Sequence, residues 1–180
     1  MVKTHKSIEI VKMQQEAGAA GFLCGTLDEC EAICNAGIQN IMYAYPVASN
    51  ASIKRIVELS KKCNFFIRLD NLEGAKKINA LAGSAKTKIN YTIIIDSGLN
   101  RFGVQPDNVV PFAKSLQGLK SLVFKGISTH PGHVYSATKA GDIPKYVDDE
   151  KTAVKKAVTA LKTAGFKLEL ITSGATPTFT

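Results

Sequence analysis

The 180-residue chain contains no tryptophan, and aromatic residues make up only 7% of it. Hydrophobic residues nevertheless account for 45%, so the core must be built from aliphatic side chains. No apolar run approaches the ~20 residues that a membrane-spanning helix needs. The N-terminal residues Met1–Lys6 also lack the apolar stretch of a secretory signal. We therefore expect a single-domain cytoplasmic protein with no membrane partner.

Cysteine is also scarce, and its spacing excludes the common metal motifs. None of Cys24, Cys30, Cys34 and Cys63 forms a CxxC pair, and no histidine lies near them in sequence to complete a zinc site. We expect four buried or half-buried thiols in a reducing compartment.

The charge of the chain is most typical of a solvated basic surface. The 23 basic and 15 acidic residues give a net charge of +8, and steering of phosphorylated or carboxylate ligands inward is the alternative interpretation. The lysines are scattered, and no arginine-rich stripe with interleaved aromatics is present. A nucleic-acid partner is therefore not predicted.

Short apolar runs with strand character alternate with helical patterns about seven times. The runs span 21–24, 41–45, 65–69, 91–95, 124–128 and 168–171, and 2–5 is a seventh candidate. Such alternation indicates parallel strands joined by helical crossovers. An open doubly wound sheet and an eight-fold barrel both satisfy it. No GxGxxG or GxxxxGK[ST] motif follows a strand, which disfavours the nucleotide-binding open sheet.

The helices carry their own start and stop signals. Thr26 and Glu29 form a capping box, and the helix that they begin is expected to end at Gly37. Asp107 is predicted to cap a helix that runs to about residue 116. Apolar residues recur at helical spacing over 153–161.

The segment after the last apolar run is a candidate anion site. In (β/α) barrels the active site forms at the carboxyl ends of the strands, and the loops after strands seven and eight often bind phosphate. Ser173–Thr178 offers small residues, hydroxyls and approachable backbone N–H groups. Taken alone, the same composition is more typical of an ordinary turn.

The N-terminal lysines are a second candidate site. If 2–5 is a strand, alternation places Lys3 and His5 on one face and Lys6 on the other. A lysine that points into a barrel is desolvated, which lowers its pKa and suits it to form a Schiff base. The alternative interpretation is an exposed, inert basic terminus.

Two further clusters follow predicted strands. Asp96 stands at a strand end, and Arg101 lies in the glycine-flanked loop after it, either as a ligand for a phenolate or carboxylate or in a structural ion pair. His130, His133 and Tyr135 follow the next strand, as acid–base groups, metal ligands or structural residues.

Taken in order, these segments resemble the D-threonine aldolase and D-serine dehydratase group, which shares the alanine racemase N-terminal-type barrel. The segments that carry the resemblance are Lys3–Lys6, Gly18–Gly21, Tyr43–Pro46, Asp96–Gly103, Thr129–Tyr135 and Ser173–Thr178. The resemblance implies an α/β, TIM-type (β/α) barrel, incomplete here with about seven of eight βα units.

The resemblance also implies a pyridoxal 5'-phosphate site. Lys3, the first lysine of the KTHK motif, would form the Schiff base, Arg101 would face the phenolic oxygen, and His130 would lie beside the ring. The catalytic residues implied are Lys3, His133 and Tyr135, with Tyr135 also against the cofactor. The residues implied for the phosphate are Ser173, Gly174, Ala175 and Thr176.

The activity implied is that of a lyase on small D-amino acids. D-Threonine would be cleaved to glycine and acetaldehyde, while D-serine dehydratase and alanine or other amino-acid racemases remain alternatives. A non-catalytic cofactor-binding module and an inactive fragment are alternatives of another class.

The chain departs from the family in what it lacks. The strand-rich second domain, which supplies a histidine with an aspartate or cysteine to a divalent metal, is absent, so no metal ligands are predicted here. The eighth strand with its Arg-Pro-Gly-Thr stretch is missing too. We expect residues 1–180 to be the cofactor-binding barrel domain, truncated and poorly active, and a homodimer as in relatives of this barrel.

Overall fold

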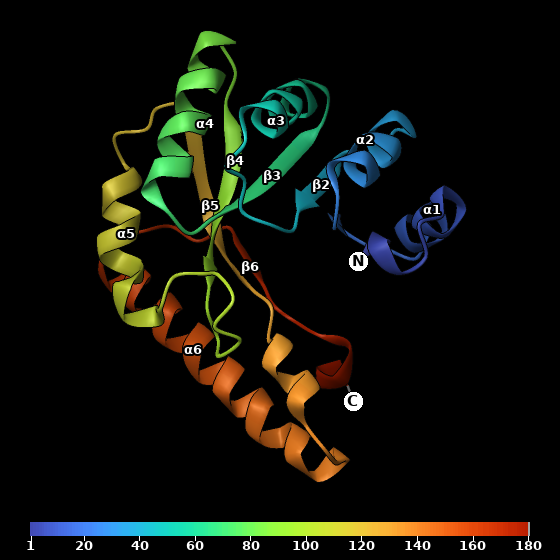
Figure 1. Cartoon of the computed structure of the whole chain (residues 1–180), viewed down its shortest axis with the longest axis vertical. Helices are drawn as coiled ribbons and strands as arrows, with labels where there is room; N and C mark the ends of the chain where they lie inside the picture. Colours follow the sequence, from blue (N-terminus) through green and yellow to red (C-terminus); the bar gives the residue numbers. More distant parts are fainter. Residues whose placement is uncertain (180) are drawn as a thin grey trace. The chain divides into compact units, whose positions relative to one another are not determined.

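The computed structural model describes residues 1–179, in which strands and helices alternate as predicted. The strands are β1 (Phe22–Cys24), β2 (Asn40–Tyr43), β3 (Asn64–Leu69), β4 (Ile89–Ile95), β5 (Leu122–Thr129) and β6 (Leu170–Thr172). The α-helices are α1 (Ile8–Glu16), α2 (Leu27–Asn35), α3 (Asn50–Lys62), α4 (Leu72–Ser84), α5 (Val109–Leu116) and α6 (Ile143–Thr163). Figure 1 labels these elements along the chain.

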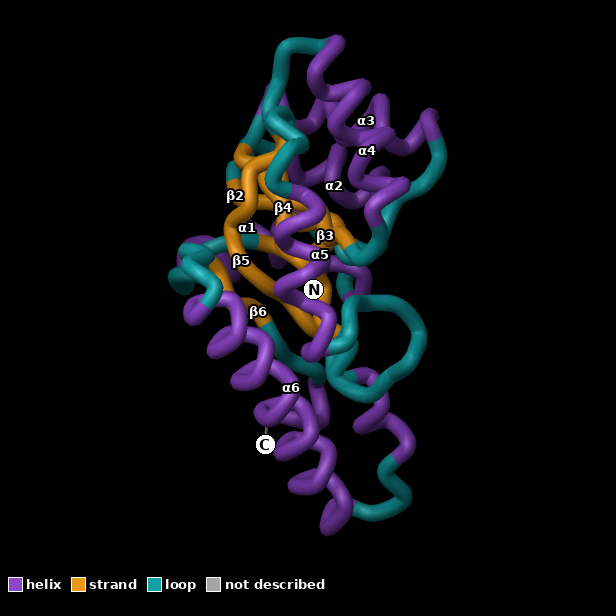
Figure 2. Tube along the Cα trace, turned by 90° about the vertical axis from the view of Figure 1, so that its left-hand side faces the viewer, coloured by secondary structure: helices purple, strands orange, loops and turns teal. Residues whose placement is uncertain are grey.

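The six strands form one sheet in the order β1-β2-β3-β4-β5-β6. The pairs β1–β2, β2–β3 and β5–β6 are parallel, as the alternation predicted. Each of the six predicted apolar runs falls on one of these strands, drawn in orange in Figure 2. The described residues therefore contain six strands, and the predicted seventh unit is not confirmed.

The strand predicted for residues 2–5 is wrong. Val2–Thr4 forms a 3₁₀ helix, η1. The Val2 carbonyl accepts hydrogen bonds from the amides of His5 at 3.1 Å and Lys6 at 2.9 Å, and Lys6 adopts a left-handed φ of 49°. These local bonds close the backbone into a turn, so strand alternation does not govern the faces of Lys3 and His5.

The chain divides into two compact units, which we describe separately. Unit 1 comprises Met1–Arg68, Glu73–Tyr91 and Leu119–Phe124. Unit 2 comprises Leu69–Leu72, Thr92–Gly118 and the chain from Lys125 onward.

Side chains cap three helices at their N-termini in unit 1. The hydroxyls of Ser7, Thr26 and Ser49 accept from backbone amides in the first turns of α1, α2 and α3. The capping box predicted at Thr26 is thus confirmed, and Gly37 ends that helix region with a φ of 91°, as expected. These local contacts fix the helix starts independently of packing.

The opposite ends of the unit 1 strands are tied by an amide ladder. The Asn64 side chain donates to the Asn40 side chain at 2.8 Å, and the Asn90 side chain donates to Asn64 at 2.8 Å. The ladder aligns the amino ends of β2, β3 and β4 and leaves the carboxyl ends for other residues.

In unit 2 the pairing of β5 with β6 requires a glycine. Gly126, with a φ of +146°, lies opposite Leu170, and a Cβ there would come within 1.9 Å of the Leu170 carbonyl oxygen. Any other residue would separate the two strands.

The predicted Asp107 cap is wrong, although the helix itself is present. Pro106–Asn108 forms a 3₁₀ turn, η2, so α5 begins one residue later, after Asn108. Asp107 instead forms an ion pair with Lys156 of α6 at 2.6 Å. The proline starts a tighter turn and moves the helix boundary past the aspartate.

The cysteines and the helices agree with the sequence interpretation. Cys24, Cys30 and Cys63 are buried and Cys34 is half-buried, all as free thiols. In the part of the chain that the structure describes, no helix has both the length and the apolar character needed to cross a membrane.

Candidate functional site

The loop after β4 in unit 2 is organised by Asp96. Its carboxylate accepts from the amides of Gly98 at 3.0 Å and Asn100 at 3.1 Å, and from the side-chain amide of Gln105 at 3.0 Å. Asp96 is buried, so these bonds satisfy a charge that would otherwise be costly. Asp96 therefore shapes the loop that carries Arg101.

Arg101 itself lies on the surface of this loop. Its guanidinium carbon is 4.4 Å from the centre of the Phe102 ring, a cation–π contact that fixes the side chain. The Arg101 side chain is exposed, and a guanidinium group is of the donor type that binds a phenolate or carboxylate.

The histidines follow β5, as the sequence indicated. His130 Nδ1 lies 3.3 Å from the carbonyl oxygen of Gly174, so the ends of β5 and β6 meet. His133 packs against Gly98, where a Cβ would come within 3.2 Å of the imidazole, and its ring meets the edge of Tyr146 at 5.4 Å. Within residues 1–179 neither buried ring nitrogen of His133 has a hydrogen-bond partner. An imidazole in this state has both nitrogens available for a ligand.

Tyr135 is not brought into this cluster by any contact. It belongs to the 3₁₀ helix η3 (Gly132–Ser136) and is 62% exposed. Among the described residues, no hydrogen bond of its hydroxyl is found.

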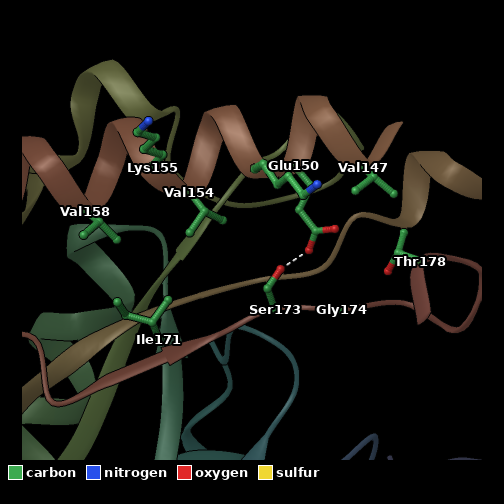
Figure 3. Close-up of a pocket in the computed structure, with 10 residues that line it drawn as sticks. Val147, Glu150, Val154, Lys155, Val158, Ile171, Ser173, Gly174 and Thr178 are labelled. Atoms are coloured by element: carbon green, nitrogen blue, oxygen red, sulfur yellow. Dashed lines mark hydrogen bonds between the residues drawn. The ribbon is translucent and has the colours of Figure 1, made fainter. Parts of the chain in front are cut away.

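The turn after β6 binds a carboxylate of the chain itself. The Ser173 hydroxyl donates to Glu150 of α6, and Figure 3 shows the Glu150 side chain reaching toward Ser173. The backbone amide of Gly174, which has a φ of +137°, also hydrogen bonds to Glu150. Two donors of the predicted phosphate turn thus converge on one anion.

The remaining residues of that turn differ in their availability. The Ala175 amide donates to the Thr178 hydroxyl at 3.1 Å, so it is already used within the turn. Thr176 begins the 3₁₀ helix η5 (Thr176–Phe179). Ser173 and Gly174 are therefore the anion-binding part of the predicted set.

Glu150 is buried and, among residues 1–179, is not part of an ion pair. Burial raises the pKa of its carboxyl group, and the hydrogen bond from Gly174 offsets only part of that rise. The turn therefore supplies the polar contacts that keep this carboxylate in place.

A cavity of about 670 Å³ opens beside this turn. Its apolar wall consists of Val147, Val154 and Val158 of α6 together with Ile171 of β6 (Figure 3). Its polar part comprises Glu150, Lys151 and Lys155 of α6 together with Ser173, Gly174 and Thr178. An apolar cavity with a few convergent polar groups is typical of small-molecule sites.

In unit 1 the predicted Schiff-base lysine is exposed, which corrects the expectation of a desolvated amine. Because η1 replaces the strand, Lys3 does not point along a strand face. Its stem lies beside Gly25 at the end of β1, where a Cβ would come within 3.3 Å of the Lys3 Cβ. Lys6 forms an ion pair with Glu29 at 2.5 Å, whereas no ion pair of Lys3 is found in residues 1–179.

Two buried charged residues, one in a strand and one in a helix, escaped the sequence interpretation. Arg68 lies inside the apolar run of β3, and Glu150 stands on the same helical stripe as Val147 and Val154. A charge at a core position is the signal that would have identified both. Within the described residues no group of three or more His, Cys, Asp or Glu side chains is placed to hold a metal ion.

Comparison with known proteins places this geometry in context. A family model described as "Alanine racemase, N-terminal domain" matches residues 1–180. The 3-hydroxy-D-aspartate aldolase of Paracoccus denitrificans is 29% identical over 180 residues, which are 98% of this chain and 46% of that protein.

A solved structure and a short relative extend the comparison. The structure of D-threo-3-hydroxyaspartate dehydratase from Delftia sp. HT23 matches with a TM-score of 0.89 at 27% identity, over 98% of this chain and 47% of that one. An uncharacterized protein of Mycobacterium tuberculosis is 29% identical over 154 residues, 85% of this chain and 88% of that protein. The chain spans about half the length of the aldolase and the dehydratase that it matches.

Proposed function

Because the chain belongs to the alanine racemase N-terminal domain family, we propose that it binds pyridoxal 5'-phosphate and acts as a lyase on D-β-hydroxy amino acids. The family membership agrees with the resemblance found in the sequence. The aldolase and dehydratase relatives carry names that specify hydroxylated D-amino acids. Within this proposal residues 1–180 are the cofactor-binding barrel domain, cytoplasmic and homodimeric.

The observation that carries the proposal is the Ser173–Gly174 turn. A hydroxyl and a backbone amide there already hold a carboxylate, so their donors are directed at one anion. A phosphate takes the same donors, and the small side chains of Gly174 and Ala175 leave its oxygens room. The residues present therefore fit the phosphate group of the cofactor.

Lys3 is the residue that we assign to the Schiff base. Lys6 is committed to Glu29, while Lys3 has no carboxylate partner in residues 1–179 and is reachable from solvent. Gly25 keeps free the space beside the Lys3 stem. Of the two neighbouring amines, Lys3 is thus the one available for reaction with an aldehyde.

The cofactor, when bound, supplies an electron sink for the charge that develops on the α-carbon. In an aldol cleavage the β-hydroxyl loses its proton to a base, the bond between the α- and β-carbons breaks, an aldehyde departs and the α-carbon takes up a proton. We assign the base to His133, whose buried ring nitrogens have no partner among the described residues. Arg101, His130 and Tyr135 are assigned to the cofactor ring and the substrate end.

Dehydration is the second candidate reaction, because the Delftia dehydratase is nearly as similar as the aldolase. A dehydratase removes the α-proton and expels the β-hydroxyl, which together leave as water. The resulting enamine tautomerises to an imine, and a water molecule hydrolyses the imine to an oxo acid and ammonia. D-Threonine as the aldolase substrate is the specific case that we propose first.

The visible spectrum of the protein mixed with pyridoxal 5'-phosphate tests the proposal. We expect a Schiff-base band in the parent and in Lys6→Ala, and no band in Lys3→Ala. Glycine release from D-threonine then assigns the aldolase, whereas pyruvate release from D-serine assigns the dehydratase. A band that persists in Lys3→Ala refutes the assignment of Lys3, and a band without turnover indicates a non-catalytic module.

A further inference from the structure

Arg68 is a buried cation for which no carboxylate partner occurs among residues 1–179. It is only 4% exposed, and within those residues its hydrogen bonding is limited to a 3.5 Å contact from Nη1 to the carbonyl oxygen of Ala44. Its Nε is buried and has no partner in the part of the chain that the structure describes. Burial lowers the pKa of Arg68 to about 10, which still leaves the group charged at neutral pH.

The surroundings of Arg68 differ from those of Arg55, another arginine of unit 1. Arg55 is half-exposed and binds two carboxylates, Asp28 at 2.5 Å and Glu31 at 2.7 Å. Solvent and two carboxylates thus stabilise the Arg55 guanidinium, whereas within the described residues the Arg68 guanidinium has neither. An uncompensated buried charge destabilises a fold, and the described part of the chain provides no anion for Arg68, so an external anion would stabilise it.

Strand register places Arg68 on the sheet face that is turned away from the helix α2. Cys24 lies opposite Tyr43, and the register of β2 with β3, in which Met42 lies opposite Phe66, sets Tyr43 level with Ile67 when it is continued by one residue. The Cys24 side chain lies near Cys30 of α2, where it raises the pKa of the Cys30 thiol. Arg68, the residue after Ile67, therefore points to the other face. In barrels of this type that face is the interior, and ligands bind where the strands end.

Arg68 also lies at the carboxyl edge of unit 1, where Lys3 is found. The Ala44 carbonyl that it contacts follows β2, and the Ala44 amide bonds to the Cys24 carbonyl at the end of β1 at 2.9 Å. Gly25, the next residue, is the neighbour of the Lys3 stem. Three adjacent strand ends thus join the buried cation to the segment with the free amine.

We infer that Arg68 binds a carboxylate of the small-molecule ligand at this edge of unit 1. The guanidinium fork matches a carboxylate in shape and can donate two parallel hydrogen bonds to it. That the ligand is an amino acid rests on the proposed function, while the need for an anion rests on the burial of Arg68 alone. Arg68 thereby becomes a determinant of substrate choice.

Two carboxylates are available in the substrates that the proposal considers. Every amino acid has an α-carboxylate, and a 3-hydroxyaspartate has a second one on its side chain. The experiment therefore uses two probes that lack an amine and need no cofactor: D-lactate, with one carboxylate, and D-malate, with two.

Isothermal titration of the full chain with D-malate and D-lactate measures the site directly. Loss of charge-assisted hydrogen bonds weakens binding by roughly 10- to 100-fold, which is the effect expected for Arg68→Met. Arg68→Lys keeps the positive charge but lacks the two parallel N–H donors of the guanidinium, so its affinity should lie between those of the parent and of Arg68→Met. Arg55→Met is the matched control, and it should bind as the parent does.

The two probes distinguish the two carboxylates. An equal loss for both probes in Arg68→Met assigns Arg68 to the carboxylate that they share, and a loss for D-malate alone assigns it to the second one. Either result stands even if pyridoxal 5'-phosphate gives no band, so this inference and the proposed function fail separately.

Thermal denaturation of the same variants separates binding from structure. If Arg68 serves a ligand, Arg68→Met should melt at the same or a higher temperature than the parent, because it removes an unpaired buried charge. The inference is overturned if the parent binds neither probe, or if Arg68→Met binds both as the parent does. A lower melting temperature that Arg68→Lys restores, with binding unchanged, would also overturn it.

Discussion

Glu29 in unit 1 and Glu150 in unit 2 are both 8% exposed, yet the pKa values of their carboxyl groups shift in opposite directions. Burial alone would raise the pKa of Glu29, but hydrogen bonds from Lys6 and from the Gly25 amide outweigh it and lower the pKa. Glu150 receives hydrogen bonds from Ser173 and Gly174 but forms no ion pair among the described residues, and burial raises its pKa. The partner, and not the depth of burial, decides the direction of the shift.

The helix starts of the two units differ in a parallel way. In unit 1, Ser7, Thr26 and Ser49 cap their helices with side chains. In unit 2, Asn108 and Asp142 precede α5 and α6 without a side-chain capping bond. Side chains thus satisfy first-turn amides of three helices in unit 1, whereas no side chain does so for α5 and α6 in the described part of unit 2.

Removal of Glu29 should have the largest effect on stability. Glu29→Ala leaves Lys6 and the Gly25 amide without their acceptor, and we expect a loss of about 3 kcal/mol in the free energy of unfolding. Urea denaturation at pH 7 measures it. Glu31→Ala on the same helix is the control, because its exposed pair with Arg55 should cost no more than about 1 kcal/mol. Equal losses in the two variants would contradict the role given to burial.

The dependence of stability on acid pH tests the comparison between Glu29 and Glu150 further. The pKa of Glu29 is lowered in the folded state, so its contribution is present above the ordinary value of 4.5 and is lost as the pH falls through the lowered pKa. In Glu29→Gln that loss should disappear, and stability should fall less steeply below pH 4.5 than in the parent. The urea concentration at the unfolding midpoint, measured for both proteins from neutral to acid pH, tests this. Parallel curves of midpoint against pH for the parent and Glu29→Gln would contradict it.

The helix caps predict a smaller difference between the units. Thr26→Ala removes the acceptor of the Glu29 amide and should destabilise by about 1 kcal/mol. Asp142→Ala at the start of α6 removes no capping bond and should change the free energy of unfolding by less than about 0.5 kcal/mol. Chemical denaturation measures the free energy of unfolding of both variants. A larger loss in Asp142→Ala than in Thr26→Ala would contradict the difference described between the helix caps of the two units.

Glu150→Gln should show the smallest effect and the opposite sign. The pKa of Glu150 is raised in the folded state, so its contribution is present below 4.5 and is lost as the pH rises through the raised pKa. The neutral amide should therefore match the parent at acid pH and exceed it at pH 8, by no more than about 1 kcal/mol. A variant that is less stable than the parent at pH 8 would show that Glu150 is a net stabilising anion.

The sequence predicted the elements well and their polar contacts poorly. The runs over 64–69 and 89–95 are strands because a buried sheet needs apolar side chains along its strands. Thr26 begins a helix because its hydroxyl accepts a hydrogen bond from the amide three residues later. The prediction failed at 2–5, where backbone bonds to the Val2 carbonyl prevail over the strand pattern. It failed at Asp107 because Pro106 begins a separate turn.

For the candidate site the sequence supplied the residue types but not their availability. It identified the Ser173 turn and the two histidines after β5, and the structure joins His130 to Gly174. It did not show that Lys3 is exposed or that Tyr135 lies in an open 3₁₀ helix. Arg68 was overlooked because one charge in an apolar run is a weak signal until its burial is known.

By itself the sequence determined the alternation of strands and helices, the caps of the first helices and the family, because each depends on neighbours along the chain or on an ordered set of motifs. Only the tertiary structure decided which charges are paired. Lys6 and Glu29 are 23 positions apart, as are Glu150 and Ser173, and yet one pair is ionic and the other is a carboxylate held by neutral donors. Burial and partner choice arise when distant segments pack together, and these two properties determine which groups remain available to a ligand.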